Sequence, residues 1–499
     1  MIATTARVET QHNMCPQAPS LVHPDHATLI ALLDGSPLSL SHYLAWGLSA
    51  GGTLLDGLSV FMLGIAIPLL IHDMSLTPAQ TGLLGAALVA GAVIGASLGG
   101  RLADRLGRKA VFLLDMGLLT LAAVIGALAW DPWLLVVTQL AAGIAIGMDF
   151  PVSSSYVAEC MPHRERSHMM VATIACQSAG MLLAAVVALG LLHLSGSPQA
   201  WRLFFASEAV LAALFLVARL HLPESPRWLM GQGRNREAVH ALENLVPEDR
   251  QKLETLATRL GDEIHHVSKL SRQSQPPGFG ILFHPAYRRR TLLSTLPWLL
   301  MDVATYGVGL FTAVLLGSLH FGASAADPLA RAEALAGGSG LIDISLLAGF
   351  LIGLWAVSRF GRIRMQLAGF AGMAAGMLVL LSSTLLDGGA AHHVALVFAG
   401  FVTFNLSMNM GPNSTTYILP AELFPTQVRA TAAGFAAACA KVGATAGVFL
   451  LPLIKSALGV ASVLALMAVV SLLGLASTWL FRIEGHGRTL EEHHSEDLP

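Results

Sequence analysis

The sequence predicts an all-α membrane protein with 12 transmembrane helices arranged as two bundles of six. Of its 499 residues, 54% are hydrophobic and 12% are charged, and the mean hydropathy is +0.64. Soluble domains carry about 25% charged residues. Apolar runs long enough to cross a bilayer recur 12 times. A polar stretch divides these runs six and six, and short motifs repeat between the two halves.

Each apolar run has about 20 residues or more, enough to span a ~30 Å hydrocarbon core. The runs fall at 44–70, 80–100, 110–130, 134–157, 168–193, 201–220, 291–318, 340–358, 365–386, 393–418, 430–454 and 459–481. The chain therefore divides into five parts. These are an N-terminal segment (1–43), a first bundle (44–220), a central loop with short helices (221–290), a second bundle (291–482) and a tail (483–499).

The distribution of basic residues predicts the orientation, because loops rich in Lys and Arg stay in the cytoplasm. One set of loops holds most of them: Arg101, Arg105, Arg108, Lys109, Arg164, Arg166, Arg359, Arg362, Arg364, Arg429, Arg482, Arg488 and those of the central loop. The opposite loops hold only Arg202, Arg331 and Lys455. Both termini and the central loop are therefore expected in the cytoplasm.

Composition and motif content argue against several other classes of protein. The net charge of −2 offers no basic surface for nucleic acid. The four cysteines (Cys15, Cys160, Cys176 and Cys439) lack metal-ligand or redox spacing. The N-terminus lacks the pattern of a signal peptide. No nucleophile elbow, zinc motif or phosphate-binding loop occurs, so we expect no enzyme activity, no cofactor and no metal.

Two motifs recur at matched places in the two halves. ADRLGRK (103–109) follows the second run, and SRFGRIR (358–364) follows the eighth. AECMPHRER (158–166) follows the fourth run, and AELFPTQVR (421–429) follows the tenth. In the second pair, a Glu precedes a Pro by three residues and an Arg by seven. A duplicated six-helix unit is typical of secondary transporters, whose sites lie between the halves near the membrane centre.

A lysine stands in the middle of the eleventh run. Lys441 is the only charge in GFAAACAKVGATAGVFLL (434–451) and lies about 12 residues, or ~18 Å at helical rise, from either end of its run. Burying it in a bilayer costs roughly 2.5–3.5 kcal/mol even on the insertion scale, and its side chain is too short to reach water. We therefore expect Lys441 to be paired or to face an aqueous cavity.

Other polar residues inside the runs are candidates for function. Asp56, Asp149 and Asp302 lie deep in the first, fourth and seventh runs, while Asp115, Glu208 and Asp343 lie nearer run ends. In the seventh run, Trp298, Asp302 and Tyr306 share one helix stripe, which favours a site wall over simple packing. Asn405, Asn409 and Asn413 form a second stripe, of which Asn413 adjoins Gly411–Pro412; Gln177 in the fifth run is a lone amide. Such amides also serve to hold helices together.

GGRLADRLGRK, PESPRWL and the paired AE..P...R motifs resemble the major facilitator superfamily, and the resemblance covers residues 44–482. It implies two six-helix bundles that alternate in access. It also implies cytoplasmic ion pairs that hold one conformation: Asp104 with the nearby basic residues, Glu159 with Arg166, and Glu422 with Arg429. The residues concerned are Asp104, Arg105, Arg108, Glu159, Arg166, Arg359, Glu422 and Arg429.

PWLLMDVATYG (297–307) and GPNSTTYILPAELFPTQVRATAAGFAAACAKVGA (411–444) resemble the phosphate:proton symporter branch of that superfamily. The resemblance implies a phosphate site lined by Trp298, Asp302, Tyr306, Gln177, Asn413 and Lys441. It implies proton passage through Asp149 and the first-span acid Asp56. Two departures are present: Phe150 stands where the branch has Tyr, and the first span has Asp56 with Ser59 in place of two acids.

These features predict a proton-coupled symporter of a small polar anion, with phosphate the leading single candidate. Lys441 would attract the anion, and Asp302, its expected partner across the interface of the halves, would take up the coupled proton. A transporter of an organic metabolite (a carboxylate, sugar or aromatic acid) is the alternative, decided by the room around Phe150 and Gly180. A non-transporting nutrient sensor is a minor alternative. We expect a monomer in contact with membrane lipids, in a bacterial inner membrane.

Overall fold

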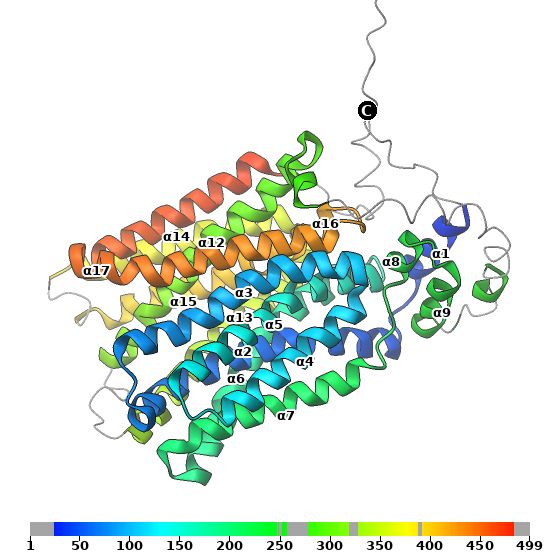
Figure 1. Cartoon of the computed structure of the whole chain (residues 1–499). Coiled ribbons are helices and arrows are strands. Elements are labelled where there is room, and N and C mark those ends of the chain that lie inside the picture. The colour runs from blue at the N-terminus through cyan, green and yellow to red at the C-terminus, as the bar shows by residue number, and fades with distance from the viewer. Residues whose placement is uncertain are drawn as a thin grey trace, which may run out of the picture.

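The computed structural model describes residues 24–246, 248, 252–256, 278–318, 328–387 and 392–483. Within these ranges the regular structure is entirely helical. Figure 1 shows long helices running side by side in two groups, with a cluster of short helices at one end. The basic loops lie at that end, which we call the cytoplasmic end.

The first group has six long helices. They are α2 (Leu40–Met74), α3 (Pro78–Leu106), α4 (Arg108–Ala127), α5 (Pro132–Cys160), α6 (Arg166–Ser195) and α7 (Trp201–Arg219), with a 3-10 turn, η1 (Pro198–Ala200), before α7. Capping residues in the sequence explain where several of these helices begin. Ser39 and Thr77 form capping boxes, and Asp131 accepts from the N–H groups of Trp133 and Leu134. Pro78 and Pro132 occupy first positions, where a missing N–H costs nothing.

The second group begins with a 3-10 turn, η3 (Phe279–Phe283). Its helices are α12 (Pro285–Ser318), α13 (Pro328–Phe360), α14 (Arg362–Leu385), α15 (Val394–Met410), α16 (Pro412–Leu423) and α17 (Arg429–Phe481). The tenth predicted span is broken into α15 and α16 at Gly411, the residue before Pro412. The last two spans lie in α17, which is interrupted at Gly459 with φ 80°.

The membrane-spanning character of these helices agrees with their surfaces. Eight helices in the described part of the chain are long and apolar enough to cross a membrane by the criteria of length and composition. The remaining four predicted spans correspond to α12, α13, the pair α15–α16 and the first part of α17. Exposed leucine, valine and tryptophan side chains cover the outer faces, for example Val186, Val210 and Trp355. The 12-helix prediction is confirmed.

Small residues allow the helices of the first group to pack closely. A Cβ on Gly95 of α3 would lie 2.0 Å from the carbonyl oxygen of Ile144 in α5. A Cβ on Gly147 of α5 would lie 2.3 Å from the carbonyl oxygen of Ala92 in α3. Glycines on both sides therefore bring the two backbones together, as is usual where lipid provides no hydrophobic driving force.

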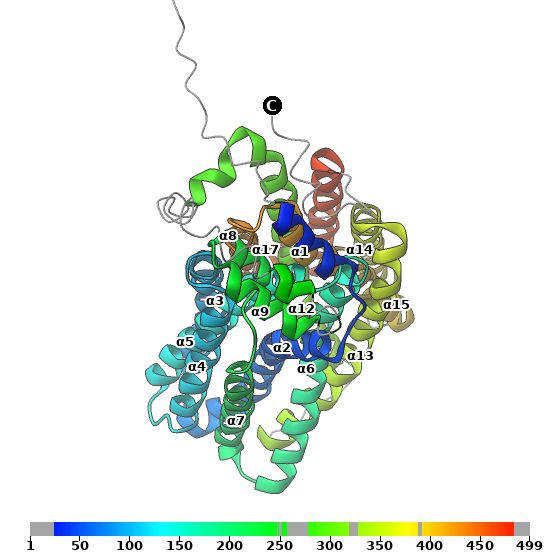
Figure 2. The ribbon, with the colours of Figure 1, turned by 90° about the vertical axis from the view of Figure 1, so that its right-hand side faces the viewer.

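Short helices lie over the cytoplasmic end. They are α1 (Pro24–Gly35), α8 (Pro226–Gly231) and α9 (Asn235–Leu245). In Figure 2 they lie in front of the long helices. Asp34 in the last turn of α1 accepts from Arg166 at 2.7 Å and from Arg227 at 2.8 Å. Glu224 accepts from the N–H groups of Arg108 and Lys109, at 2.9 and 3.2 Å. These bonds fasten the short helices to α6 and α4.

Candidate functional site

Lys441 lies beside Asp302 where the two groups of helices meet. Its Nζ is 3.7 Å from Asp302 Oδ2, and the two side chains are 12% and 5% exposed. Nζ also donates to the Tyr306 hydroxyl at 3.3 Å and lies 5.3 Å from the centroid of the Phe150 ring. Phe150 is on α5, whereas the other three are on α12 and α17. The expected Asp302 partner is therefore in place, although Asp302 is on the same half as Lys441.

The close packing of α12 on α17 explains this pairing. A Cβ on Gly443 would lie 2.4 Å from the carbonyl oxygen of Leu299, and one on Gly447 would lie 2.9 Å from that of Val303. The two backbones therefore nearly touch one turn beyond Lys441. Because Asp302 follows Leu299 by three residues, its carboxylate faces the lysine. Trp298, one turn before Asp302, is 5% exposed.

Asp56 and Gln177 form the polar pair of the first half. Gln177 Nε2 donates to Asp56 Oδ2 at 2.5 Å, linking α2 to α6. A Cβ on the adjoining Gly57 would lie 2.0 Å from the Gln177 carbonyl oxygen, so the helices are in contact here. Asp56 is also near enough to Lys441 and Asp302 for their charges to interact. The two polar pairs thus form one charged region between the halves.

Asn413 is bonded within its own half. Its Nδ2 donates to Asn409 Oδ1 at 2.7 Å, and Asn409 donates to the carbonyl oxygen of Leu346 in α13 at 3.1 Å. Asn405 is buried. The asparagine stripe therefore holds α15, α16 and α13 together. Asn413 uses only its side-chain N–H in this bond, so its side-chain oxygen is available to other partners.

Asp149 lies in a separate buried cluster that the sequence analysis did not anticipate. Arg219 of α7 donates to Asp149 at 2.8 Å and to Asp115 at 3.0 Å, and all three side chains are at most 1% exposed. Arg219 also donates to the carbonyl oxygens of Leu48, Ser49 and Phe112. In the sequence, Asp115 and Asp149 were acids inside the membrane with no assigned basic partner. Arg219, at the end of the sixth run, was the residue that could have indicated one.

Two other sequence observations acquire structural roles. Glu208 accepts from the Ser59 hydroxyl at 2.5 Å, both being buried. Ser59 therefore partners an acid of α7 instead of replacing an acid of the site. Gly180 does not line a cavity beside Phe150, because a Cβ there would lie 1.9 Å from the carbonyl oxygen of Leu54. Gly180 therefore adds no room for a larger substrate, because this glycine packs α6 against α2.

Phe150 has an aromatic neighbour from the other half. Its ring meets Tyr417 of α16 edge to face, with centroids 6.2 Å apart. The Tyr417 hydroxyl is 2.9 Å from the Ser153 hydroxyl of α5. Phe150 itself has no hydroxyl, but the neighbouring Tyr417 from the opposite half carries one.

Ion pairs join the two halves at the cytoplasmic end. Arg108 donates to Asp104 at 3.1 Å and to Glu159 at 2.9 Å, and Arg429 of α17 donates to Glu159 at 2.9 Å. Asp104 accepts from the N–H of Thr431 at 2.7 Å, at the positive end of α17. All of these side chains are nearly inaccessible to solvent. This network bonds the first half to the second at the cytoplasmic end.

The pairing within the network differs from expectation. The expected Glu159–Arg166 pair does not form, since Arg166 bonds Asp34. Glu422 bonds Arg362 at 2.7 Å, while Arg429 crosses to Glu159. Arg105 and Arg359 are exposed. The repeat offered the signal: Arg108 and Arg362 occupy the same place in their motifs, as do Glu159 and Glu422. The spacing of seven residues between each Glu and its Arg was misleading. The chain turns between the helix that carries the Glu and the helix that begins at the Arg, so the two side chains do not meet.

The halves approach most closely where α3 meets α17. A Cβ on Gly100 would lie 2.0 Å from the carbonyl oxygen of Ala430, and one on Gly434 would lie 2.3 Å from that of Ala96. These backbones must separate if the cytoplasmic end opens. Opening of the cytoplasmic end would therefore break this contact.

Gly100→Val should shift the protein toward a cytoplasm-open state, because the added methyl groups cannot fit at the α3–α17 contact. Spin labels at positions 164 and 364, measured by double electron–electron resonance, should show a longer distance in the variant than in the wild type. Gly117→Val is the control, since a Cβ there meets no atom within 4 Å. Equal distances in Gly100→Val and the control would contradict the prediction.

The fold and the site together define a class of protein. Two six-helix bundles enclose a charged region at their interface, and ion pairs join them at one end; this is the architecture of a secondary transporter. The sugar (and other) transporter family model matches residues 69–496. The chain belongs to this family, a branch of the major facilitator superfamily, and is therefore a multi-pass membrane transporter and not an enzyme.

Comparisons with known proteins agree with this assignment. The chain is 30% identical over 452 residues to the inner membrane metabolite transport protein YgcS of Escherichia coli, covering 91% of this chain and 94% of that one. It is 28% identical over 435 residues to the inorganic phosphate transporter PHO84 of Saccharomyces cerevisiae, covering 79% and 72%. The proton:xylose symporter XylE of E. coli shares the fold, with a TM-score of 0.75 at 22% identity over 91% and 98% of the chains.

Proposed function

We propose that the chain is a proton-coupled symporter of a small polar anion, with inorganic phosphate as the leading single candidate. The observation that carries this proposal is the Lys441–Asp302 pair at the interface of the halves. A buried lysine needs a counter-charge, which the Asp302 carboxylate supplies. This counter-charge can be exchanged, because a proton can neutralise the carboxylate. An arriving anion can then take the place of that carboxylate.

The coupling follows from charge balance. When an anion binds to Lys441, the nearby Asp302 carboxylate is repelled by it, so a proton binds to Asp302 together with the anion. Tyr306, Gln177 and Asn413 supply hydrogen bonds, and Trp298 and Phe150 form the wall. When the anion leaves on the cytoplasmic side, Asp302 loses its proton and pairs with Lys441 again. Substrate and proton travel together because each removes the electrostatic cost of the other.

The remaining acids have graded roles in this proposal. Asp56 is hydrogen-bonded to Gln177 and lies in electrostatic range of Asp302, so we assign it the storage or relay of the proton. Asp149 is the third proposed proton group, and its bond to Arg219 means that protonation there requires the arginine to keep Asp115 as its counter-charge. The closed network around Glu159 is proposed to hold the state that is shut toward the cytoplasm.

An organic metabolite is the second candidate, favoured by the Phe150 ring 5.3 Å from Lys441 Nζ. An aromatic face near the cation, with Tyr306 and Tyr417 close by, suits a carboxylate that carries an apolar or ring-shaped body. The metabolite transport protein to which the chain is similar agrees with this candidate. A sensor that binds without transport would show no counterflow in proteoliposomes.

Substrate-dependent stabilisation against heat should distinguish the candidates, because a ligand that binds only the folded protein raises its melting temperature. We expect phosphate to stabilise the wild type, whereas sulfate, carboxylates and sugars should not. Stabilisation by a carboxylate or sugar and not by phosphate would favour the second candidate. The same screen on Lys441→Ala identifies ligands that act elsewhere.

Asp302→Asn should uncouple transport from the proton gradient, because an amide cannot exchange a proton. In proteoliposomes, we expect uptake driven by an imposed pH gradient to be lost, while exchange of internal for external substrate persists. Glu237→Gln, on the exposed face of α9, is the control and should behave as wild type. Gradient-driven accumulation by Asp302→Asn at the wild-type level would disprove the role of this carboxylate.

A further inference from the structure

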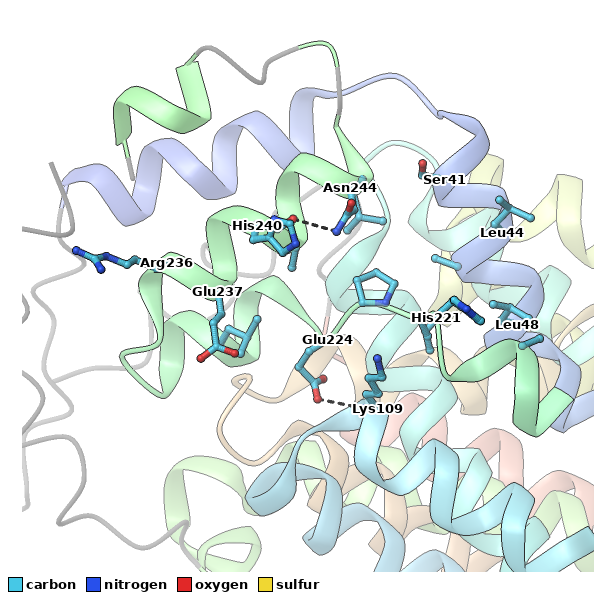
Figure 3. A pocket seen from close by; sticks show the side chains of 17 residues that line it. Ser41, Leu44, Leu48, Lys109, His221, Glu224, Arg236, Glu237, His240 and Asn244 are labelled. Carbon is cyan, nitrogen blue, oxygen red and sulfur yellow. Dashed lines mark hydrogen bonds between the residues drawn. The ribbon is translucent and has the colours of Figure 1, made fainter. Parts of the chain in front are cut away.

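A pocket lies at the cytoplasmic end of the first half, away from the Lys441 region. It has a volume of about 850 Å³ and is bounded by the first turns of α2, the start of α4, the segment after α7, and α9. Figure 3 shows Lys109 and His221 on one side of it and His240 and Asn244 of α9 on the other. We call it the α2–α9 pocket.

The α2–α9 pocket has an apolar wall and a basic rim. Leu44, Ala45 and Leu48 of α2 form the wall, together with Ala218 and Leu222. The rim carries Lys109, Arg236, His221 and His240. A ligand that fills this pocket would therefore combine an apolar portion with a negatively charged one.

The acidic groups of the α2–α9 pocket are already engaged. Glu224 accepts from the N–H groups of Arg108, Lys109 and Ser225. Glu237 pairs with Arg234 at 2.5 Å. Within the described ranges of the chain, no carboxylate pairs with Lys109 or Arg236. The Lys109 ammonium and the Arg236 guanidinium are therefore available to an anionic ligand, with the Glu224 carboxylate in the same lining and His240 beside Glu243.

An exposed apolar stripe runs along the membrane face of α7 to the α2–α9 pocket. Val210, Leu214 and Val217 are 60%, 62% and 58% exposed and are followed at helical spacing by His221. On α2, Leu40 and Leu44 are 75% and 59% exposed. These apolar faces are suited to contact with lipid, and the α2–α9 pocket lies at their cytoplasmic end.

We propose that the α2–α9 pocket binds an anionic phospholipid of the cytoplasmic leaflet. Its phosphate lies against Lys109 and the rim, and its acyl chains follow the α7 stripe. Lysine and arginine at a cytoplasmic membrane boundary attract anionic headgroups, and basic pockets between spanning helices hold them. Because the site contacts α2, α4 and α9 together, the bound lipid also ties the short cytoplasmic helices to the first bundle.

The test is native mass spectrometry of the detergent-purified full chain titrated with phosphatidylglycerol and, separately, with phosphatidylcholine of the same acyl chains. We expect the wild type to retain phosphatidylglycerol preferentially. Lys109→Gln combined with Arg236→Gln should weaken its binding about 25-fold, since each basic residue contributes about fivefold. Arg164→Gln combined with Arg288→Gln removes the same charge from exposed cytoplasmic positions and should have little effect.

A second variant fills the α2–α9 pocket without changing its charge. Ala218→Trp should reduce phosphatidylglycerol retention, with folding checked by an unchanged thermal unfolding profile. Equal retention by wild type and both pocket variants would overturn the proposal, as would equal binding of phosphatidylcholine. Competition by inorganic phosphate or glycerol 3-phosphate at the lipid's own concentration would instead assign the site to a soluble phosphate and overturn the lipid assignment.

Discussion

Lys441→Ala is expected to abolish substrate binding and uptake. A hydrogen bond to a charged group contributes about 1.5–3 kcal/mol, equivalent to roughly 10- to 150-fold in affinity. The substitution also leaves Asp302, 5% exposed, without its cation. Binding is measured as heat by calorimetry, or as thermal stabilisation, with the ligand found in the substrate screen.

The double variant Lys441→Ala with Asp302→Asn separates binding from folding. It removes both charges, so the unpaired carboxylate of the single variant is no longer present and much of the lost stability should return. Substrate binding should not return, because the attracting cation is still missing. Wild-type affinity in the single variant, or recovery of binding in the double variant, would sink the assignment of Lys441 as the anion-binding group.

Arg219→Leu should have the largest effect on folding. The guanidinium is fully buried and donates to Asp115, Asp149 and three backbone carbonyl oxygens. Breaking a buried ion pair by removing one partner typically costs about 3–5 kcal/mol. We expect a strongly lowered melting temperature in detergent and poor recovery from membranes, measured by fluorescence-detected unfolding.

Neutralising the acids should partly rescue this variant. Arg219→Leu combined with Asp115→Asn and Asp149→Asn removes the unpaired charges, so its melting temperature should exceed that of the single variant. Arg202→Leu is the matched control: Arg202 lies in the first turn of α7, bonds one carbonyl oxygen and is only half-buried. A triple variant no more stable than Arg219→Leu would show that the guanidinium acts through packing and backbone bonds alone.

Residues inside the membrane differ in how far the sequence could predict their partners. Lys441 and Asp302 were the only deep charges of the second half whose signs could balance. The stripe of Trp298, Asp302 and Tyr306 indicated which face of the seventh span carries the site. The lysine's expected partner followed from charge balance alone. Arg219 was overlooked because it stands one residue from the end of its run, where an arginine ordinarily marks the membrane boundary. Its depth depends on how α7 packs beside α4 and α2.

The sequence alone determined the number of helices, their orientation and the class of protein, because hydrocarbon admits only spans of fixed length and basic loops remain in the cytoplasm. Apart from the Lys441–Asp302 pair, tertiary structure alone decided the partners of the charges. Glu159 bonds Arg108 and Arg429, and Arg166 bonds Asp34, because pairing depends on which helix ends meet in space. The α2–α9 pocket likewise arises from four segments separated by up to 200 residues, and no local pattern records their meeting.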